Sequence, residues 1–127
     1  MSTANLAISH LAESQSSKEV TVNAAMDALD GALAGLLAVA MADADQTPST
    51  ANALSHIVFE CTGALTADRN LILPTNKKLY IVANQTTGGH NIVAKTSAGT
   101  GVTIAAADGF VICYCDGTNI VKICKSA

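Results

Sequence analysis

The chain contains no tryptophan, and its aromatic residues are limited to Phe59, Tyr80, Phe110 and Tyr114 among 127 residues. Half of the residues are hydrophobic, but many of these are alanine. A chain of this length buries about two-thirds of its unfolded surface, which is enough for one core. Because small side chains fill that core, we expect it to be thin, and oligomerisation is one way to bury more apolar surface.

Charge is also scarce. Charged residues make up 13% of the chain, against about a quarter in typical globular domains. Seven Lys and Arg stand against ten Asp and Glu, and no basic patch is interleaved with aromatic residues, so we expect no nucleic-acid binding. A surface low in charge and rich in Thr, Asn, Ser and Gly is common where subunits pack against one another.

Long hydrophobic runs and targeting signals are missing as well. The most apolar run, GALAGLLAVAMA at 31–42, is shorter than the roughly twenty residues that a bilayer span needs. The N-terminus lacks the basic start and apolar centre of a signal peptide. We therefore expect no membrane association and a protein made and folded in a cytoplasm.

The four cysteines are Cys61, Cys113, Cys115 and Cys124. No CxxC pair occurs and no histidine follows at zinc-finger spacing, so a zinc site is not expected. We interpret the cysteines as small buried hydrophobic residues in a reduced compartment. The alternative is a disulfide that joins Cys124 to Cys113 or Cys115.

Residues that could carry catalysis are scattered. The histidines, His10, His56 and His90, never fall at helical metal-ligand spacing with a carboxylate between them. Glu60, Asp68, Asp108 and Asp116 could be imagined as paired carboxylates, but the three aspartates lie in turn contexts, where Asp has a hydrogen-bonding role. No phosphate loop and no activated cysteine is recognisable. The sequence predicts no enzyme, no catalytic residue, no cofactor and no metal.

Three regions follow one another along the chain: an N-terminal attachment segment and helix (1–43), a linker (44–53) and a β domain (54–127). The linker contains Pro48, which disfavours helix at the preceding residue. The predicted helix covers 23–43 and begins at Asn23, whose side chain can accept a free backbone N–H of the first turn. Gly31 and Gly35 weaken this helix but let another backbone approach closely.

One apolar stripe runs along the predicted helix at three- and four-residue steps. We expect it to pack either on its own domain or against copies of the chain or another protein, although it is too short to predict a coiled coil. The candidate residues for an oligomer or capsid contact are Met26, Leu29, Leu33, Leu36 and Leu37.

The second half predicts a mainly β fold of short antiparallel strands in a sandwich or flattened barrel, preceded by the N-terminal helix. NQTTGGHN at 84–91 is predicted to be a hairpin loop, and DGTN at 116–119 is a second hairpin signal. Several strands are apolar on both faces, which indicates burial between two sheets or against a neighbouring subunit. The predicted strands cover 54–61, 70–73, 79–83, 92–96, 102–105, 110–115 and 120–124.

The segments TGALTADRNLILP, YIVANQTTGGHNIVAKTSAGTGVTI and FVICYCDGTNIVKI together resemble a pattern in bacteriophage virion proteins. The resemblance covers 62–121, and the order and spacing of its parts are specific. SSKEVTVNAAMDALDGAL, nearer the N-terminus, resembles a shorter phage motif found at the start of tail-fibre, head-fibre and decoration-type proteins. The extra cysteines and the alanine-rich continuation of the helix depart from these patterns.

The resemblance implies a structural virion protein, often a homotrimer, with an attaching N-terminal part and a projecting β part. We expect a capsid decoration, cement or head-spike protein, because no shaft or tip follows the β module. A tail-fibre or tail-adaptor protein is the alternative, and a small carbohydrate-binding β module is the second alternative. The implied partners are the major capsid protein or another virion protein, and further copies of the chain. The implied location is the virion, after synthesis in the host bacterial cytoplasm.

Overall fold

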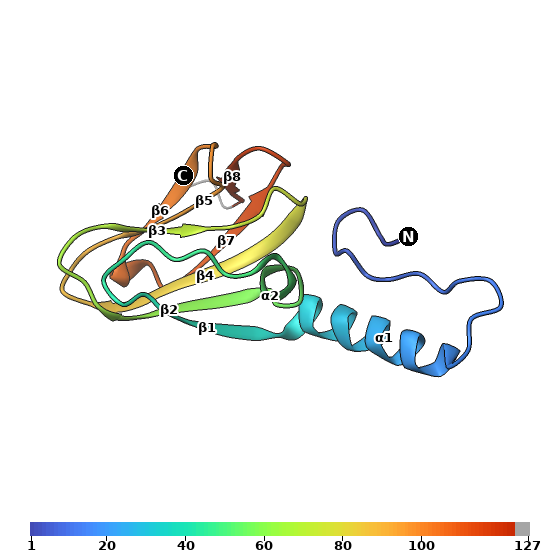
Figure 1. Cartoon of the computed structure of the whole chain (residues 1–127). Helices are drawn as coiled ribbons and strands as arrows, with labels where there is room; N and C mark the ends of the chain where they lie inside the picture. Colours follow the sequence, from blue (N-terminus) through green and yellow to red (C-terminus); the bar gives the residue numbers. More distant parts are fainter. Residues whose placement is uncertain (124–127) are drawn as a thin grey trace.

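The computed structural model describes residues 1–123, and it places two stacked sheets beside a projecting N-terminal helix (Figure 1). Ahead of the strands, the helix α1 covers Lys18–Ala34, and a short helix α2 covers Thr50–Leu54 between β1 and β2. The strands are β1 (Leu36–Ala40), β2 (Val58–Ala64), β3 (Arg69–Ile72), β4 (Lys78–Thr87), β5 (Ile92–Lys95), β6 (Gly101–Ile104), β7 (Phe110–Cys115) and β8 (Ile120–Lys122), with a 3-10 turn at Ala106–Asp108 before β7.

The prediction of a mainly β fold behind an N-terminal helix is confirmed. One sheet has the strand order β1-β2-β4-β7-β8 and the other β3-β5-β6. Both contribute to one apolar core, in which the rings of Phe59 and Tyr80 meet edge to face with centroids 5.5 Å apart. The arrangement is a sandwich of two mixed sheets and not a closed barrel.

The expectation of purely antiparallel strands is wrong. β1 pairs with β2, β2 with β4, and β3 with β5, all in parallel. The pairs β4–β7, β5–β6 and β7–β8 are antiparallel. Parallel neighbours need a crossover connection. A strand of the opposite sheet lies in the connection for β2–β4 and β3–β5, whereas the connection of β1 to β2 contains α2.

These crossovers wind the chain into stacked turns. We call each turn a coil; it passes once along the five-stranded sheet and once along the three-stranded side of the sandwich. From β2 the chain passes to β3 in the other sheet, returns as β4 beside β2, and crosses again to β5 beside β3. Leu36 pairs with Val58, which is 22 residues on, and Val58 pairs with Ile81, 23 residues further. A bridge from Gln46 to Leu71 adds the first coil to the same stack. The antiparallel strands β6, β7 and β8 then cover its other end.

The helix is placed differently from the prediction. It begins at Lys18 instead of Asn23, and it ends at Ala34 because Gly35 turns into extended backbone (φ −74°, ψ 141°). Residues 36–40 then form β1, so the predicted helix over 23–43 is wrong in its second half. Leucine and alanine spacing suits a helix, but pairing with β2 supplies backbone hydrogen bonds along the whole segment and decides the outcome.

The close approach predicted at Gly31 is confirmed. A Cβ at this position would lie 2.2 Å from the carbonyl oxygen of Ser55, so only glycine lets the end of α1 contact the end of α2. Within the stretch expected as a linker, α2 begins after Ser49, whose hydroxyl accepts the N–H of Asn52 at 3.2 Å. The division into an attachment segment, a linker and a β domain stays a prediction.

The predicted hairpin at 84–91 is also wrong. β4 continues to Thr87, and the chain crosses from there to the other sheet through Gly88 and Gly89, which have φ of 105° and 76°. The DGTN hairpin is confirmed, since β7 and β8 are joined there and Asp116 accepts the N–H groups of Thr118 and Asn119.

The predicted burial of the cysteines is confirmed for the residues that the structure describes. Cys61, Cys113 and Cys115 are free thiols in the core. Burial raises the pKa of Cys61 to about 12 and, against a smaller opposing effect of Lys122, that of Cys113 to about 11. Cys124, the fourth cysteine and the common partner in the alternative disulfide, lies outside the described residues.

One buried amide holds the two sheets together at the crossing after β4. The Nδ2 atom of Asn84 donates to the carbonyl oxygens of His90 and Ile104, both at 3.0 Å. Its Oδ1 atom accepts the N–H and the hydroxyl of Thr86. The amide nitrogen therefore joins β4 to β6 and to the segment before β5, while the amide oxygen is satisfied within β4.

We expect Asn84→Ala to lower the free energy of unfolding by about 1–3 kcal/mol, because it leaves buried carbonyls and a hydroxyl without partners. Urea unfolding followed by circular dichroism measures the loss. Asn23→Ala, at an exposed position of α1, is the matched control and should stay within about 0.5 kcal/mol of wild type. Equal stability of the two variants would show that Asn84 does not hold the crossing.

Candidate assembly surface

The outer face of the five-stranded sheet carries apolar side chains on all five strands, with the polar residues Thr62 and Gln85 towards one end of β2 and β4. Along each strand, side chains alternate between the core and this outer face. The row that joins Leu37, Phe59, Val82 and Val111 points into the core, whereas the next row joins Leu36, Val58, Ile81 and Ile112 on the outside. We call the outward set the outer face: Leu36, Val58, Leu79, Ile81, Phe110, Ile112, Tyr114 and Val121.

Much of this apolar area is open to solvent. Phe110 is 56% exposed, Leu36 50% and Ile112 42%. Large apolar side chains are normally scattered on a soluble surface, and a contiguous patch marks a contact site. Among the described residues of these strands, Glu60 brings the one acidic side chain to this side of the sheet, in the row that also contains Ala83 and Phe110.

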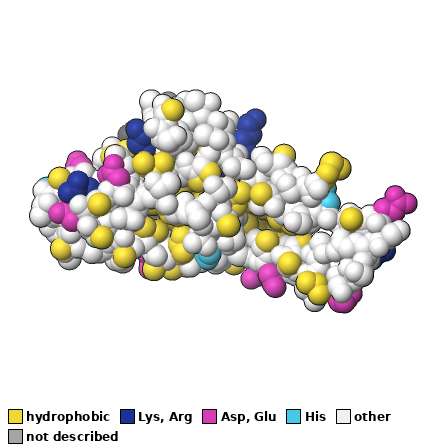
Figure 2. Space-filling model, in the orientation of Figure 1, with side chains coloured by type: hydrophobic (Ala, Val, Ile, Leu, Met, Phe, Trp, Pro, Cys, Tyr) yellow, Lys and Arg dark blue, Asp and Glu magenta, His cyan; other side chains and the backbone are white. Residues whose placement is uncertain are grey.

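The helix α1 carries a second exposed apolar stripe. Val22, Met26, Leu29 and Leu33 are all exposed, and Met26 and Leu33 are each about two-thirds exposed (64% and 69%). Among the residues of α1, Ala32 is the buried one. Figure 2 shows hydrophobic side chains at the surface of both the β domain and the projecting helix.

The structure separates the five residues that the sequence indicated as a contact stripe. Met26, Leu29 and Leu33 lie exposed on α1, and Leu36 is exposed at the start of β1. Leu37 instead faces inward and packs against the core, because neighbouring residues of a strand point to opposite faces. The larger part of the apolar surface, on β4, β7 and β8, was not assigned as a site, although the double-faced apolar strands KLYIVA and FVICYC signalled it.

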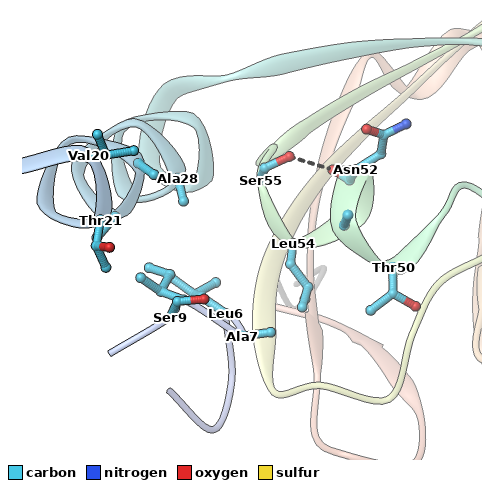
Figure 3. A pocket seen from close by; sticks show the side chains of 14 residues that line it. Leu6, Ala7, Ser9, Val20, Thr21, Ala28, Thr50, Asn52, Leu54 and Ser55 are labelled. Carbon is cyan, nitrogen blue, oxygen red and sulfur yellow. Dashed lines mark hydrogen bonds between the residues drawn. The ribbon is translucent and has the colours of Figure 1, made fainter. Parts of the chain in front are cut away.

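A groove lies between the N-terminal segment, α1 and α2 (Figure 3). It has a volume of about 600 Å³ and is lined mostly by small apolar side chains, with Leu6 and Leu54 among the larger ones. The polar groups at its edge are hydroxyls and an amide, such as Thr21, Ser55 and Asn52. None of its lining residues is titratable, so this groove offers packing surface and no acid or base.

Of the four carboxylates considered for catalysis, the three aspartates accept backbone hydrogen bonds, whereas Glu60 lies on the outer side of β2. Asp108 accepts the N–H of Ala105 at 2.8 Å, and Asp116 shapes the β7–β8 turn. Asp68 accepts the N–H of Asn91 from the next coil at 2.8 Å and lies 3.6 Å from the ring of His90. Within residues 1–123, no group of three or more His, Cys, Asp or Glu side chains is placed to hold a metal ion.

Buried Lys78 was not singled out by sequence reasoning. Its ammonium donates to the carbonyl oxygens of His56 and Leu79 and lies 4.4 Å from the centre of the Tyr80 ring. Burial lowers the pKa of this lysine to about 8. These contacts hold the segment between α2 and β2 against β4. The charge of Lys78 therefore has a structural role.

Aspartates at the corners link successive coils of the stack. Asp43 accepts the hydroxyl and N–H of Thr66 and pairs with Arg69 at 3.0 Å, and these contacts lower its pKa to about 2, the Thr66 hydroxyl contributing most. Asp45 and Asp68 accept the backbone N–H and side-chain amide of an asparagine in the next coil, Asn70 and Asn91 respectively, and these bonds lower both pKa values.

Acid should therefore weaken the fold through these corners. Carboxyl groups whose pKa is lower in the folded state than the ordinary 3.8 stabilise the fold fully above that value and lose this effect as the pH falls towards about 2. We expect the thermal unfolding midpoint to fall between pH 5 and pH 2, and to fall less steeply in Asp43→Asn. Asp27→Asn, exposed on α1, should follow the wild-type profile. A flat wild-type profile over this range would contradict the assignment.

The comparisons with known proteins add no relative: no protein-family model, no curated protein and no solved structure matches the chain. In the described residues, no helix is long and apolar enough to cross a membrane.

Proposed function

We propose that this chain is a structural protein of a phage virion that assembles as a homo-oligomer through the outer face of its five-stranded sheet. The observation that carries the proposal is the contiguous apolar surface on β1, β2, β4, β7 and β8. At about 25 cal/mol for each Å² of apolar surface removed from water, covering such a face stabilises an assembly strongly. A trimer, with each copy turning this face towards a common axis, is the expected form.

The virion assignment is supported by the resemblance over 62–121, and the fold explains which residues carry it. TTGG forms the corner where β4 crosses to β5, and CDGTN forms the β7–β8 turn. The LTADRNLILP part contains a corner of the stack, with Asp68 bound to Asn91 of the next coil. These are residues that build the scaffold, so the resemblance concerns the fold, and the outer face adds the argument for assembly.

On the particle, we propose a capsid decoration, cement or head-spike role, with the major capsid protein or another virion protein as the partner. The segment before β1 is the proposed attachment region. The tail-fibre or tail-adaptor alternative is favoured by one observation, the stack of parallel coils, because such a stack extends along one axis as a shaft does.

Labelling of intact particles tests the proposal. Virions of the phage that encodes the chain, treated with a gold-labelled antibody against the β domain, should carry label over the capsid. Label on the tail would replace the decoration role by the tail role. Purified particles that contain none of the chain by mass spectrometry would overturn the virion assignment.

A further inference from the structure

The residues on α1 divide by size between two neighbouring stripes. The stripe of Thr21, Ala25, Ala28 and Ala32 is buried or half-buried, and its members Thr21, Ala25 and Ala28 line the groove against the N-terminal segment and α2 (Figure 3). The neighbouring stripe is the exposed one of Val22, Met26, Leu29 and Leu33. The helix therefore packs its small side chains against its own chain. Its large apolar side chains stay exposed, with Ile8 and Leu11 of the N-terminal segment beside Val22, Met26 and Leu29.

The spacing of the large side chains is that of a coiled-coil seam. Val22, Met26, Leu29 and Leu33 follow one another at steps of four, three and four residues, as the a and d positions of a heptad do. An isolated helix of about this length is marginal in water, and most helices depend on packing of an apolar face. With Ala32 as its buried residue, α1 lacks such packing on this side.

The exposed stripe of α1 is followed directly by the outer face. Gly35 alone separates α1 from β1, and the exposed side chain of Leu36 begins the outward row that continues through Val58, Ile81 and Ile112. The exposed apolar surface of the helix thus passes directly into that of the sheet. A single partner surface can cover both.

The orientation of that partner follows from the length of the helix. At about 1.5 Å per residue, α1 is about 25 Å long. Antiparallel pairing of two α1 helices would place their β domains at opposite ends of the pair and keep the outer faces apart. Parallel pairing sets the β domains side by side, so that seam and outer face are buried in one interface.

We propose that α1 forms a parallel helix bundle with the α1 helices of neighbouring copies, in register along Val22, Met26, Leu29 and Leu33. The proposal rests on the proposed self-assembly through the outer face, and it adds the direction and register of the helices. All N-terminal segments leave the bundle at one end.

Disulfide cross-linking of the full chain tests the bundle. In a background with Cys124→Ser, Met26→Cys and Leu33→Cys should each cross-link to their own copies under mild oxidation. We expect this on the order of tenfold faster than for Asp27→Cys, because equivalent seam positions fall within the roughly 7 Å between Cα atoms that a disulfide spans. Asp27 lies beside Met26 but outside the seam, and it is exposed. The Cys124→Ser parent alone should not cross-link.

Two outcomes overturn the inference. An oligomer of normal size in which Met26→Cys and Leu33→Cys cross-link no faster than Asp27→Cys leaves the proposed assembly standing and removes the bundle. Cross-linking of Val22→Cys to Leu33→Cys in mixed samples, with neither variant linking to itself, shows antiparallel helices. A wild-type chain that is monomeric at micromolar concentration in sedimentation velocity removes both the bundle and the proposed self-assembly.

Discussion

Ile112→Asp is expected to turn the assembled protein into a folded monomer. Ile112 lies near the middle of β7, 42% exposed, in the outward row with Ile81 and Val58, and between Phe110 and Tyr114 along its own strand. In a monomer the new carboxylate is solvated, so the cost to the fold is about 1 kcal/mol or less. In an interface it is buried without a partner, which should weaken each contact by on the order of 100-fold.

Sedimentation velocity and circular dichroism together measure this effect. The variant should sediment as a monomer and keep the spectrum of the wild-type chain. Thr103→Asp, at an exposed position of β6 in the other sheet, introduces the same group away from the outer face and should leave the oligomer intact. If Ile112→Asp keeps the wild-type sedimentation coefficient, the outer face is not the surface that holds the copies together.

Gly88→Ala is expected to be the most damaging small substitution within a single copy. Gly88 has φ of 105°, and a Cβ there would lie 2.2 Å from the carbonyl oxygen of Leu65. Leu65 belongs to the corner of the preceding coil, and its N–H donates to Thr87 O at 2.9 Å. Neither backbone segment can move away without breaking this contact. Backbone strain and overpacking together should cost on the order of 4 kcal/mol.

The adjacent glycine provides a matched control. Gly89 also has a positive φ, 76°, but a Cβ there meets nothing within 4 Å. Gly89→Ala should therefore cost only about 1–2 kcal/mol from the left-handed backbone. Urea unfolding, or the yield of soluble protein if Gly88→Ala does not fold, separates the two. Equal losses would mean that strain alone, and not the close stacking of coils, requires glycine at this corner.

Local signals in the sequence predicted much of the fold. The strands after position 69 and the turn at 116–119 follow from short-range patterns of β-formers and turn residues. The double-faced apolar strands also indicated that a sheet would have two apolar faces. Local pattern was sufficient in these places because each of these features is decided within a few residues.

The long-range pairing could not be predicted in the same way. Alternating strands and glycine turns fit a hairpin within one sheet and a crossing between two sheets equally well. The hairpin predicted at 84–91 is therefore a crossing in the structure. Leu36, Leu37 and Ala40 continue a helical spacing, yet β2 offers them a strand partner. The change from helix to strand at Gly35 also divides the predicted contact residues. Leu36 stays on the surface with Met26 and Leu33, while Leu37 enters the core.

The stacked coils have a consequence for how this chain can vary in length. Each turn of the stack uses 22 or 23 residues between paired positions in the large sheet, and its corner contacts, such as that of Asp68 with Asn91, fit one neighbour to the next. Adding a complete turn preserves the inward and outward pattern of every later strand, whereas an insertion of one residue within a strand exchanges the two faces. Such a chain can therefore lengthen in whole turns, while its antiparallel strands keep the far end closed.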